Sequence, residues 1–274
     1  MCRGSSGEKT VINGEAGFAG RDGSVSVKPR GRPAERAGIG NAGRVVTQAR
    51  QIELEYSDLL VVVGAGEVDL VLLEELRAAG GHIVAADGGA EILAAAGLAP
   101  EAIIGDFDSV VDPFGWLGRS RLIKIAEQDT TDFEKVLYST RAPVTVALGM
   151  TGGRLDHTLS PLDVAGRYAA ERFIIIVDTE DLALALSGPF GHEVEAGERV
   201  SVHPLGPIRF RRSTGLKYAL NGLLLAPVGK GGTSNSAIKG AFTIVPEDGE
   251  TAPWLLLLPR RYLMGLIERL LVLA

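Results

Sequence analysis

Short apolar runs alternate with segments of helical periodicity from residue 59 onward. The runs predict six buried parallel strands, at Leu59–Val63, His82–Ala86, Ala102–Gly105, Leu122–Ile125, Val144–Leu148 and Phe173–Val177. Between them, helices are predicted at Val68–Ala79, Ala90–Ala96, Phe133–Ser139 and His157–Ala170. This alternation is typical of an α/β fold with a doubly wound, mostly parallel sheet, in which ligands bind at the carboxyl ends of the strands.

The pattern changes after Asp178. Short strand-like pieces separated by Gly and Pro follow, at Leu182–Leu186, Arg199–His203, Ile208–Arg211, Leu223–Leu225, Phe242–Val245 and Leu255–Leu258. They predict a smaller all-β sandwich domain. The last segment, Arg260–Leu273, has apolar residues at helical spacing and predicts an amphipathic helix that serves packing.

The first part of the chain has a different composition. Residues 1–50 contain ten Gly and no periodic run, which is typical of a segment that cannot bury enough apolar surface to fold. We therefore expect four parts: a disordered extension at 1–57, an α/β catalytic domain at 58–178, a β-sandwich domain at 179–260 and a helical tail at 261–274.

Charge and composition exclude several classes of protein. Residues 1–50 carry a net charge of +5, so the rest of the chain carries −11, and such an acidic body disfavours nucleic acid as a partner. The single cysteine, Cys2, excludes an internal disulfide framework and fits a cytoplasmic protein. We expect no membrane span and no secretory signal, because no apolar run of the required length or placement occurs.

Two carboxylates follow the third predicted strand. Asp106 and Asp108 are two residues apart, so in extended chain both project from the same side. Adjacent like charges favour a cation, and Mg²⁺ prefers such oxygen ligands. The alternative is a solvated turn, in which Asp and Ser are ordinary residues.

A second acidic group, Glu127 to Asp132, follows the fourth predicted strand and precedes a helix. Its structural interpretation is a capping box, with Asp129 as the N-cap and Asp132 three residues later. Its functional interpretation is that both carboxylates lie at the same sheet edge as Asp106 and Asp108.

Glycine-rich turns follow two other strands. Gly149 to His157 includes Gly152, Gly153, Arg154 and Asp156, and glycine turns before a helix let backbone N–H groups approach phosphate oxygens. Asp87-Gly88-Gly89-Ala90 is a second such junction. Neither matches a dinucleotide-binding fingerprint or a Walker loop, which excludes a P-loop kinase. Together the clusters indicate metal-assisted transfer from a nucleotide.

These motifs resemble the thiamine pyrophosphokinase family. The match rests on Asp87 to Ala90, Gly105 to Ser109, Asp129 to Asp132 with Glu134, Thr151 to His157, Gly215 to Leu220, and Thr233-Ser234-Asn235, in the family's order from about Asp58 to Arg260. The resemblance implies an α/β domain followed by a β-sandwich, in a homodimer whose active sites are shared between subunits. Its implied reaction transfers the diphosphate of ATP to the hydroxyl of thiamine, with Mg²⁺, and releases AMP.

The resemblance also implies roles for individual residues. Asp106, Asp108 and Asp129 would bind Mg²⁺, and Asp132, Asp156 and Arg154 would be catalytic. The nucleotide would contact Asp87, Gly88, Gly89, Thr131, Thr151, Gly152 and Gly153, and thiamine would contact Tyr218, Leu220, Ser234 and Asn235. Asp132 and Asp156 are both candidates for the base that accepts the hydroxyl proton.

Two alternatives stay open at this point. One is another diphosphokinase on a related scaffold, for example one that acts on a hydroxymethylpterin. The other is a thiamine or nucleotide sensor without catalytic activity. The sequence departs from the family's common pattern at Gln128 and Ser236.

Overall fold

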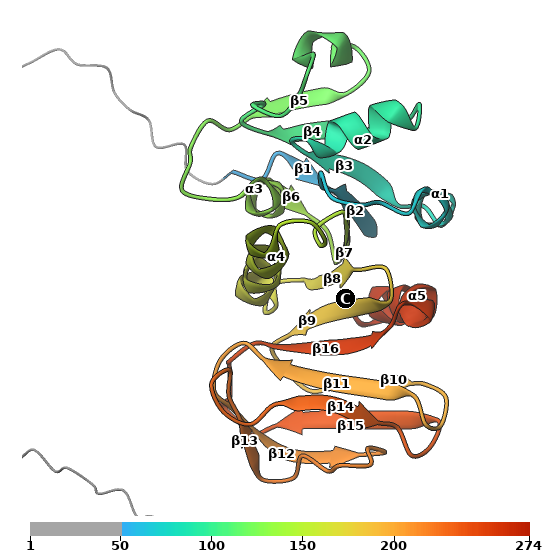
Figure 1. The fold of residues 1–274 in the computed structure, drawn as a ribbon, viewed down its shortest axis with the longest axis vertical. Helices are drawn as coiled ribbons and strands as arrows, with labels where there is room; N and C mark the ends of the chain where they lie inside the picture. Colours follow the sequence, from blue (N-terminus) through green and yellow to red (C-terminus); the bar gives the residue numbers. More distant parts are fainter. Residues whose placement is uncertain (1–50) are drawn as a thin grey trace, which may run out of the picture. The chain divides into compact units, whose positions relative to one another are not determined.

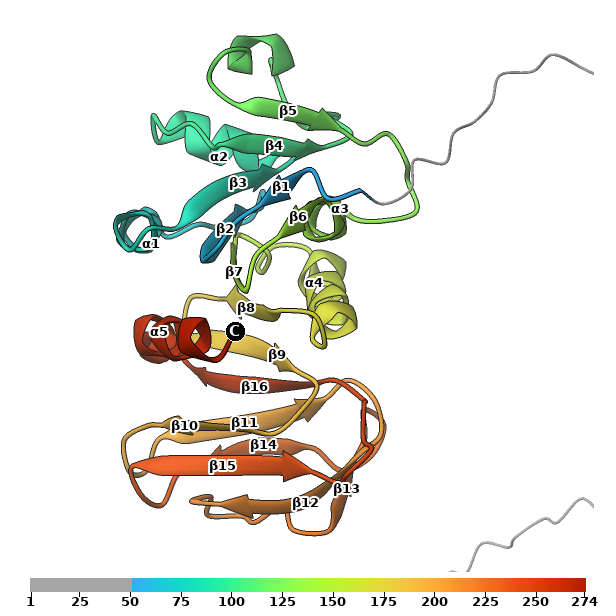
Figure 2. The ribbon, with the colours of Figure 1, turned by 180° about the vertical axis from the view of Figure 1, so that it is seen from behind.

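A computed structural model describes residues 51–274 (Figures 1 and 2). Residues 1–50 of the expected disordered extension lie outside the described residues. We expected the extension to end at residue 57, but the ordered fold already begins before that residue. Strand β1 (Leu54–Glu55) pairs in parallel with β6 (Thr140–Arg141), and Leu54 and Tyr56 pack against a hydrophobic core, so this stretch is part of the fold.

The dominant element is a ten-stranded sheet in the order β14-β11-β16-β9-β8-β7-β2-β3-β4-β5. Its parallel half consists of β2 (Leu59–Val63), β3 (His82–Ala86), β4 (Ala102–Gly105), β5 (Arg121–Lys124), β7 (Val144–Leu148) and β8 (Phe173–Val177). The six predicted parallel strands are therefore confirmed. β5 is not buried as expected, because it is the edge strand and has only β4 as a neighbour.

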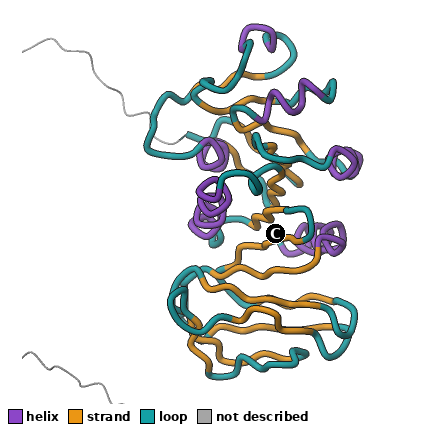
Figure 3. Tube along the Cα trace, in the orientation of Figure 1, coloured by secondary structure: helices purple, strands orange, loops and turns teal. Residues whose placement is uncertain are grey.

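Helices cover both faces of the parallel half (Figure 3). Alternate residues of a strand point to opposite faces. Leu59, Val61 and Val63 share a core with α1 (Leu70–Ala78) and α2 (Gly89–Ala95). Leu60 and Val62 share a second core with α3 (Asp132–Ser139) and α4 (Leu155–Tyr168). The α/β class predicted from the sequence is confirmed.

The rest of the fold is rich in β-structure. The large sheet continues through the antiparallel strands β9 (Asp181–Leu186), β16 (Trp254–Pro259), β11 (Arg199–Pro204) and β14 (Gly232–Ser236). A four-stranded sheet contains β10 (Phe190–Glu193), β15 (Ala241–Pro246), β12 (Ile208–Thr214) and β13 (Leu223–Leu225). The two sheets share one core, in which the Phe210 ring meets the Trp254 ring edge-on at 5.6 Å.

The division that we expect between residues 178 and 179 falls inside the large sheet. β8 pairs antiparallel with β9, with Val177 opposite Leu182, so both halves of the fold belong to one continuous sheet. A short helix, η1 (Pro113–Trp116), links β4 to β5. At the other end of the described chain, η2 (Arg260–Tyr262) leads into α5 (Leu263–Leu273), the predicted C-terminal helix. Across residues 51–274, the helices lack the length and apolarity needed to cross a membrane.

Candidate active site

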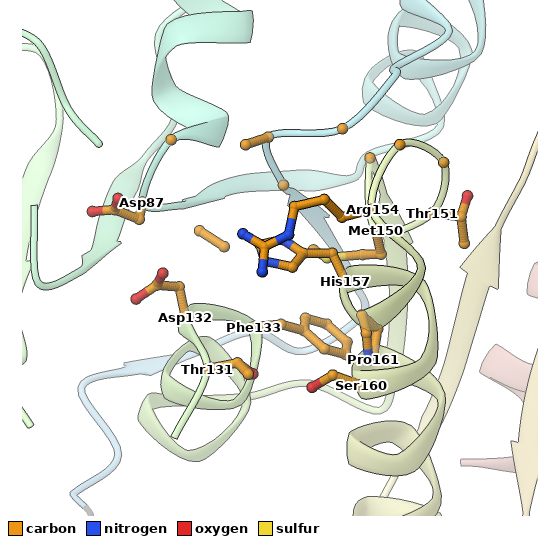
Figure 4. A pocket seen from close by; sticks show the side chains of 18 of the residues that line it. Asp87, Thr131, Asp132, Phe133, Met150, Thr151, Arg154, His157, Ser160 and Pro161 are labelled. Atoms are coloured by element: carbon orange, nitrogen blue, oxygen red, sulfur yellow. The ribbon is translucent and has the colours of Figure 1, made fainter. Parts of the chain in front are cut away.

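Five loops meet at the carboxyl edge of the parallel strands, including the four that the sequence predicts to gather there. Loops after β2, β3, β4, β7 and the segment before α3 surround a cavity of about 630 Å³ (Figure 4). The lining includes nine of the candidate residues: Asp87, Gly88, Thr131, Asp132, Thr151, Gly152, Gly153, Arg154 and Asp156. Motifs that are far apart in the sequence therefore form one site.

Three carboxylates gather beside this cavity. One oxygen each from Asp87, Asp106 and Asp108 lies within 4.8 Å of the others. Oxygen donors at this spacing fit a hard cation such as Mg²⁺. Asp87, which we expected to contact nucleotide, thus joins the two expected metal ligands. Asp129 does not belong to this group, and its role as a metal ligand stays a prediction.

Asp87 also fixes the loop that carries the other two carboxylates. Its side chain is 2% exposed and accepts hydrogen bonds from the backbone N–H groups of Phe107 (2.8 Å) and Ser109 (3.0 Å). Asp87 itself has a positive φ of 41° and Phe107 one of 68°, a region that non-glycine residues rarely occupy. Hydrogen bonds between the two loops therefore hold a strained backbone that presents Asp106 and Asp108.

A buried lysine, Lys135, lies next to these carboxylates and was not predicted as a site residue from the sequence. Lys135 is 2% exposed, and its Nζ lies 3.0 Å from Asp132 Oδ1 and 3.6 Å from Asp106 Oδ2. Burial by itself lowers the pKa of Lys135, but the hydrogen bond and attraction to Asp132 raise it overall, so the group is charged. Lys135 follows Asp132 by three residues on one helix, and this spacing is the signal in the sequence from which their ion pair could have been predicted.

The loop before α3 is organised by Glu127. Its carboxylate accepts hydrogen bonds from the backbone N–H groups of Asp129 (2.7 Å) and Thr130 (3.0 Å) and from the Tyr138 hydroxyl (2.9 Å). Gln128, one residue on, donates to Asp106 Oδ2 at 2.6 Å. This hydrogen bond is the main cause that keeps the pKa of Asp106 below its usual range. The two acidic loops are therefore directly joined.

The predicted N-cap of α3 is wrong by two residues. Thr131, not Asp129, is the N-cap, and its hydroxyl accepts from the Glu134 backbone N–H at 3.3 Å. Thr131 and Glu134 have the S/T-x-x-E spacing of a capping box, which places the helix start at Asp132. This start lets Asp132 line the cavity from the first turn of α3.

The glycine turn after β7 has a left-handed backbone at three positions. Gly149, Gly152 and Gly153 have φ values of 67°, 84° and 63°, so glycine is required for this path. Arg154 and Asp156, just beyond the turn, form a forked ion pair with a shortest distance of 2.6 Å, and both are exposed to the cavity. In Figure 4, Arg154 extends toward the centre of the cavity beside His157.

Gly89 has a packing role in addition to the nucleotide contact that we expect of it. It does not line the cavity. A Cβ at this position would lie 1.9 Å from the carbonyl oxygen of Val63, so only glycine lets the start of α2 pack against β2. The structure thus gives Gly89 a packing role, and its contact with nucleotide stays a prediction.

The four residues expected to contact thiamine lie in the β-rich part. They do not line the cavity within one chain. Asn235 is 3% exposed, accepts from the Tyr218 backbone N–H at 2.9 Å and donates to the Tyr218 carbonyl at 2.7 Å. Leu220 is buried, and the Ser234 backbone N–H donates to Ser201 Oγ at 3.0 Å. Asn235 therefore shapes the segment that exposes Tyr218.

Comparisons with known proteins agree on one family. Residues 73–177 match the model of the thiamin pyrophosphokinase catalytic domain. The chain is 30% identical to thiamine pyrophosphokinase 1 of Oryza sativa subsp. japonica over 155 residues, which are 50% of this chain and 58% of the relative. It is 29% identical to thiamine pyrophosphokinase 2 of Arabidopsis thaliana over 171 residues, covering 55% and 63% of the two chains.

Solved structures show the same fold. The thiamin pyrophosphokinase of Geobacillus thermodenitrificans has a TM-score of 0.60 at 25% identity, covering 73% of this chain and 97% of that one. The Candida albicans enzyme has a TM-score of 0.62 at 16% identity, with coverages of 78% and 95%. The chain spans only 58% and 63% of the two curated relatives described above. The family model, the relatives and the structures agree that the chain is similar to proteins of the thiamine pyrophosphokinase family.

Proposed function

We propose that this protein is a thiamine pyrophosphokinase, which transfers the diphosphate of ATP to the hydroxyl of thiamine and releases AMP. The observation that carries the proposal is that Asp87, which belongs to a group of three carboxylates, lines one cavity together with a glycine turn and Arg154. Acidic groups for a cation and backbone N–H groups for phosphates are the parts that phosphoryl-type transfer requires. The helices on both faces also support the doubly wound classification of the sheet.

Mg²⁺ is the proposed metal. Asp87, Asp106 and Asp108 would hold it, and Asp129 stays a candidate for a further ligand once phosphates are bound. When bound, Mg²⁺ would neutralise charge on the phosphate oxygens. Lys135 adds a fixed positive charge beside Asp106 and Asp132, and Arg154 offers a planar fork of N–H donors to the transferred group.

Asp132 is the better of the two candidate bases for the thiamine hydroxyl. It lines the cavity, and burial raises its pKa in spite of the hydrogen bond from Lys135. A raised pKa makes a carboxylate a better proton acceptor. Asp156 is also held in an ion pair, with Arg154, but this pairing lowers its pKa. We infer that the deprotonated hydroxyl attacks the β-phosphorus in line and AMP leaves.

A homodimer with shared active sites is part of the proposal. Asp106 follows β4 and Ser234 lies on β14, and eight strand steps separate β4 from β14 in the sheet. At about 4.8 Å a step, the two are roughly 38 Å apart along the sheet. One thiamine molecule cannot bridge this span, so the thiamine contacts of a site would come from a second copy. The cytoplasm remains the compartment that we expect, from the single cysteine in the sequence.

The test is an assay of AMP release from ATP with and without thiamine and with and without Mg²⁺. We expect AMP only when both are present. Asp106→Asn should abolish turnover and leave the fold intact, whereas Asp163→Asn, on the exposed side of α4, should behave like the wild type. Full activity of Asp106→Asn would contradict the metal assignment. AMP release with a hydroxymethylpterin in place of thiamine would favour the other diphosphokinase. No AMP release with any acceptor would favour a sensor without catalytic activity.

A further inference from the structure

Glu127 lies in the loop between β5 and α3, and it belongs neither to the group of three carboxylates nor to the lining of the active-site cavity. Four donors nevertheless converge on its carboxylate. The backbone N–H groups of Asp129 (2.7 Å) and Thr130 (3.0 Å) donate to Oε2, and the hydroxyls of Thr130 and Tyr138 donate to Oε1. Hydrogen bonds to a charged acceptor are stronger than those between neutral groups. Glu127 therefore fixes the path of residues 127–130.

The Tyr138 hydroxyl ties this loop to a rigid element. Tyr138 lies on α3, and its hydrogen bond to Glu127 Oε1 is 2.9 Å long. The helix itself is held in the core by the buried side chains of Phe133, Val136 and Leu137. A functional group is placed most precisely when its support rests on packed secondary structure. The loop is thus anchored to α3, and not only by contacts between neighbouring residues of its own.

Gln128 carries the effect of this anchor to the proposed metal site. Its side-chain amide donates to Asp106 Oδ2 at 2.6 Å, and the Asp108 backbone N–H donates to Asp106 Oδ1 at 3.1 Å. Both oxygens of Asp106 are therefore held. Ordering an exposed residue such as Gln128 costs backbone and side-chain entropy, and a backbone that is already fixed removes the first of these costs. The contacts of Glu127 thus favour the hydrogen bond from Gln128 to Asp106.

The group of three carboxylates needs such support, because like charges this close repel one another in the absence of a cation. Building on the proposed function, we propose that Glu127 is a positioning residue, which holds the loop of residues 127–130 so that Gln128 keeps Asp106 in the group that binds Mg²⁺. Glu127 contacts neither the cation nor a substrate in this arrangement, and it acts only through Gln128. The metal site is therefore formed before the cation arrives.

Binding of Mn²⁺ to the full chain, followed by electron paramagnetic resonance without nucleotide or thiamine, tests this role. Mn²⁺ takes the same carboxylate and water ligands as Mg²⁺. Loss of a group that orients a metal ligand typically weakens metal binding by ~10–100-fold, so we expect Glu127→Ala and Gln128→Ala each to lose about tenfold or more. Gln128 is exposed, so Gln128→Ala tests the link without disturbing the core.

Two further variants separate positioning from a general loss of structure. The double variant Glu127→Ala with Gln128→Ala should lose no more affinity than the more strongly affected single variant, because two residues that act in series are not additive. Glu127→Gln keeps an acceptor oxygen for the backbone N–H groups and should recover most of the affinity. Glu75→Ala, on the exposed side of α1, is the control and should bind Mn²⁺ as the wild type does.

The positioning role fails on any of three results. Wild-type affinity in Glu127→Ala would show that the metal site needs no support from this loop. A loss in the double variant equal to the product of the two single losses would show that Glu127 does not act through Gln128. An equal loss in Glu127→Gln and Glu127→Ala would assign the effect to the missing negative charge.

These results are distinct from a failure of the proposed function. That function stands as long as the wild type releases AMP when thiamine is present, whatever the variants of Glu127 and Gln128 do. Absence of Mn²⁺ binding by the wild type would instead overturn the metal assignment, and the positioning role with it.

Discussion

The ammonium group of Lys135 lies 3.0 Å from a carboxylate oxygen of Asp132, and the same group is 3.6 Å from Asp106. One buried cation thus links α3 to the loop after β4 that carries Asp106 and Asp108. Removing one partner of a buried charged pair leaves the other uncompensated, which costs more than the pair itself contributes.

Lys135→Met should reduce turnover strongly while leaving cation binding in place. Without the ammonium group, Asp132 and Asp106 lose their fixed partner, and we expect kcat/KM to fall by about 100-fold, the usual effect of removing one preorganised donor. Binding of Mn²⁺, followed by electron paramagnetic resonance, should be at least as tight, because a positive charge has left the site. Lys124→Met, an exposed position on β5, is the control. Wild-type turnover in Lys135→Met would refute the role.

Substitutions of Asp87 and Asp129 should affect the affinity for Mg²⁺ differently. Asp87 belongs to the carboxylate group and holds the loop of Asp106, whereas Asp129 lies outside the group. We therefore expect Asp87→Asn to weaken Mg²⁺ binding in the absence of nucleotide by more than about tenfold. Asp129→Asn should leave it within about twofold. Calorimetric titration with Mg²⁺ measures both, and a larger loss in Asp129→Asn would restore Asp129 as the principal ligand.

Gly89→Ala tests the packing of α2 on β2. The added Cβ would meet the Val63 carbonyl at 1.9 Å, so the helix must shift, and we expect a loss of about 1–3 kcal/mol in the free energy of unfolding. Gly188→Ala, where nothing lies within 4 Å of the new Cβ, should change it by less than about 0.5 kcal/mol. Urea unfolding gives both free energies of unfolding. If Gly89→Ala were as stable as Gly188→Ala, the packing role of Gly89 would be contradicted.

Because His192 is buried, we expect the protein to lose stability in mild acid. Burial, and then the charge of Arg269, lower its pKa below 6.5, and its Nδ1 has no hydrogen-bond partner in the described part of the chain. The unfolded chain therefore binds the proton more readily, and stability falls as the pH drops below about 6.5. In His192→Phe, the free energy of unfolding, measured by urea unfolding at a series of pH values, should depend less on pH between pH 7 and pH 5. His203→Gln, at an exposed position, should leave the wild-type slope.

Local patterns were enough to predict much of the fold. Five of the six parallel strands are buried apolar runs, which leave a strong hydrophobic signal, and the edge strand β5 was found from its central Leu122 and Ile123. The gathering of Asp87, Asp106, Asp132 and Arg154 followed from the rule that parallel strands end at one edge.

Long-range pairing could not be predicted in the same way. The antiparallel joining of β8 to β9 depends on tertiary contacts, so the sequence suggests a domain boundary where the sheet continues. Gly89 has the appearance of a ligand-binding glycine, and only the position of Val63 shows that it serves packing. From the sequence, Lys135 looks like an ordinary residue on a helix surface. Only the structure shows that Asp106, from a different loop, lies beside it.

The join between β8 and β9 has a mechanical consequence. Backbone hydrogen bonds run without interruption from β5 to β14, so the described part of the chain has no flexible linker about which its two halves could rotate. Closure over a substrate by domain rotation, as in hinged enzymes, is therefore not available within one chain. Closure over the cavity would then fall to the loops at the sheet edge, among them the glycine turn of residues 149–153.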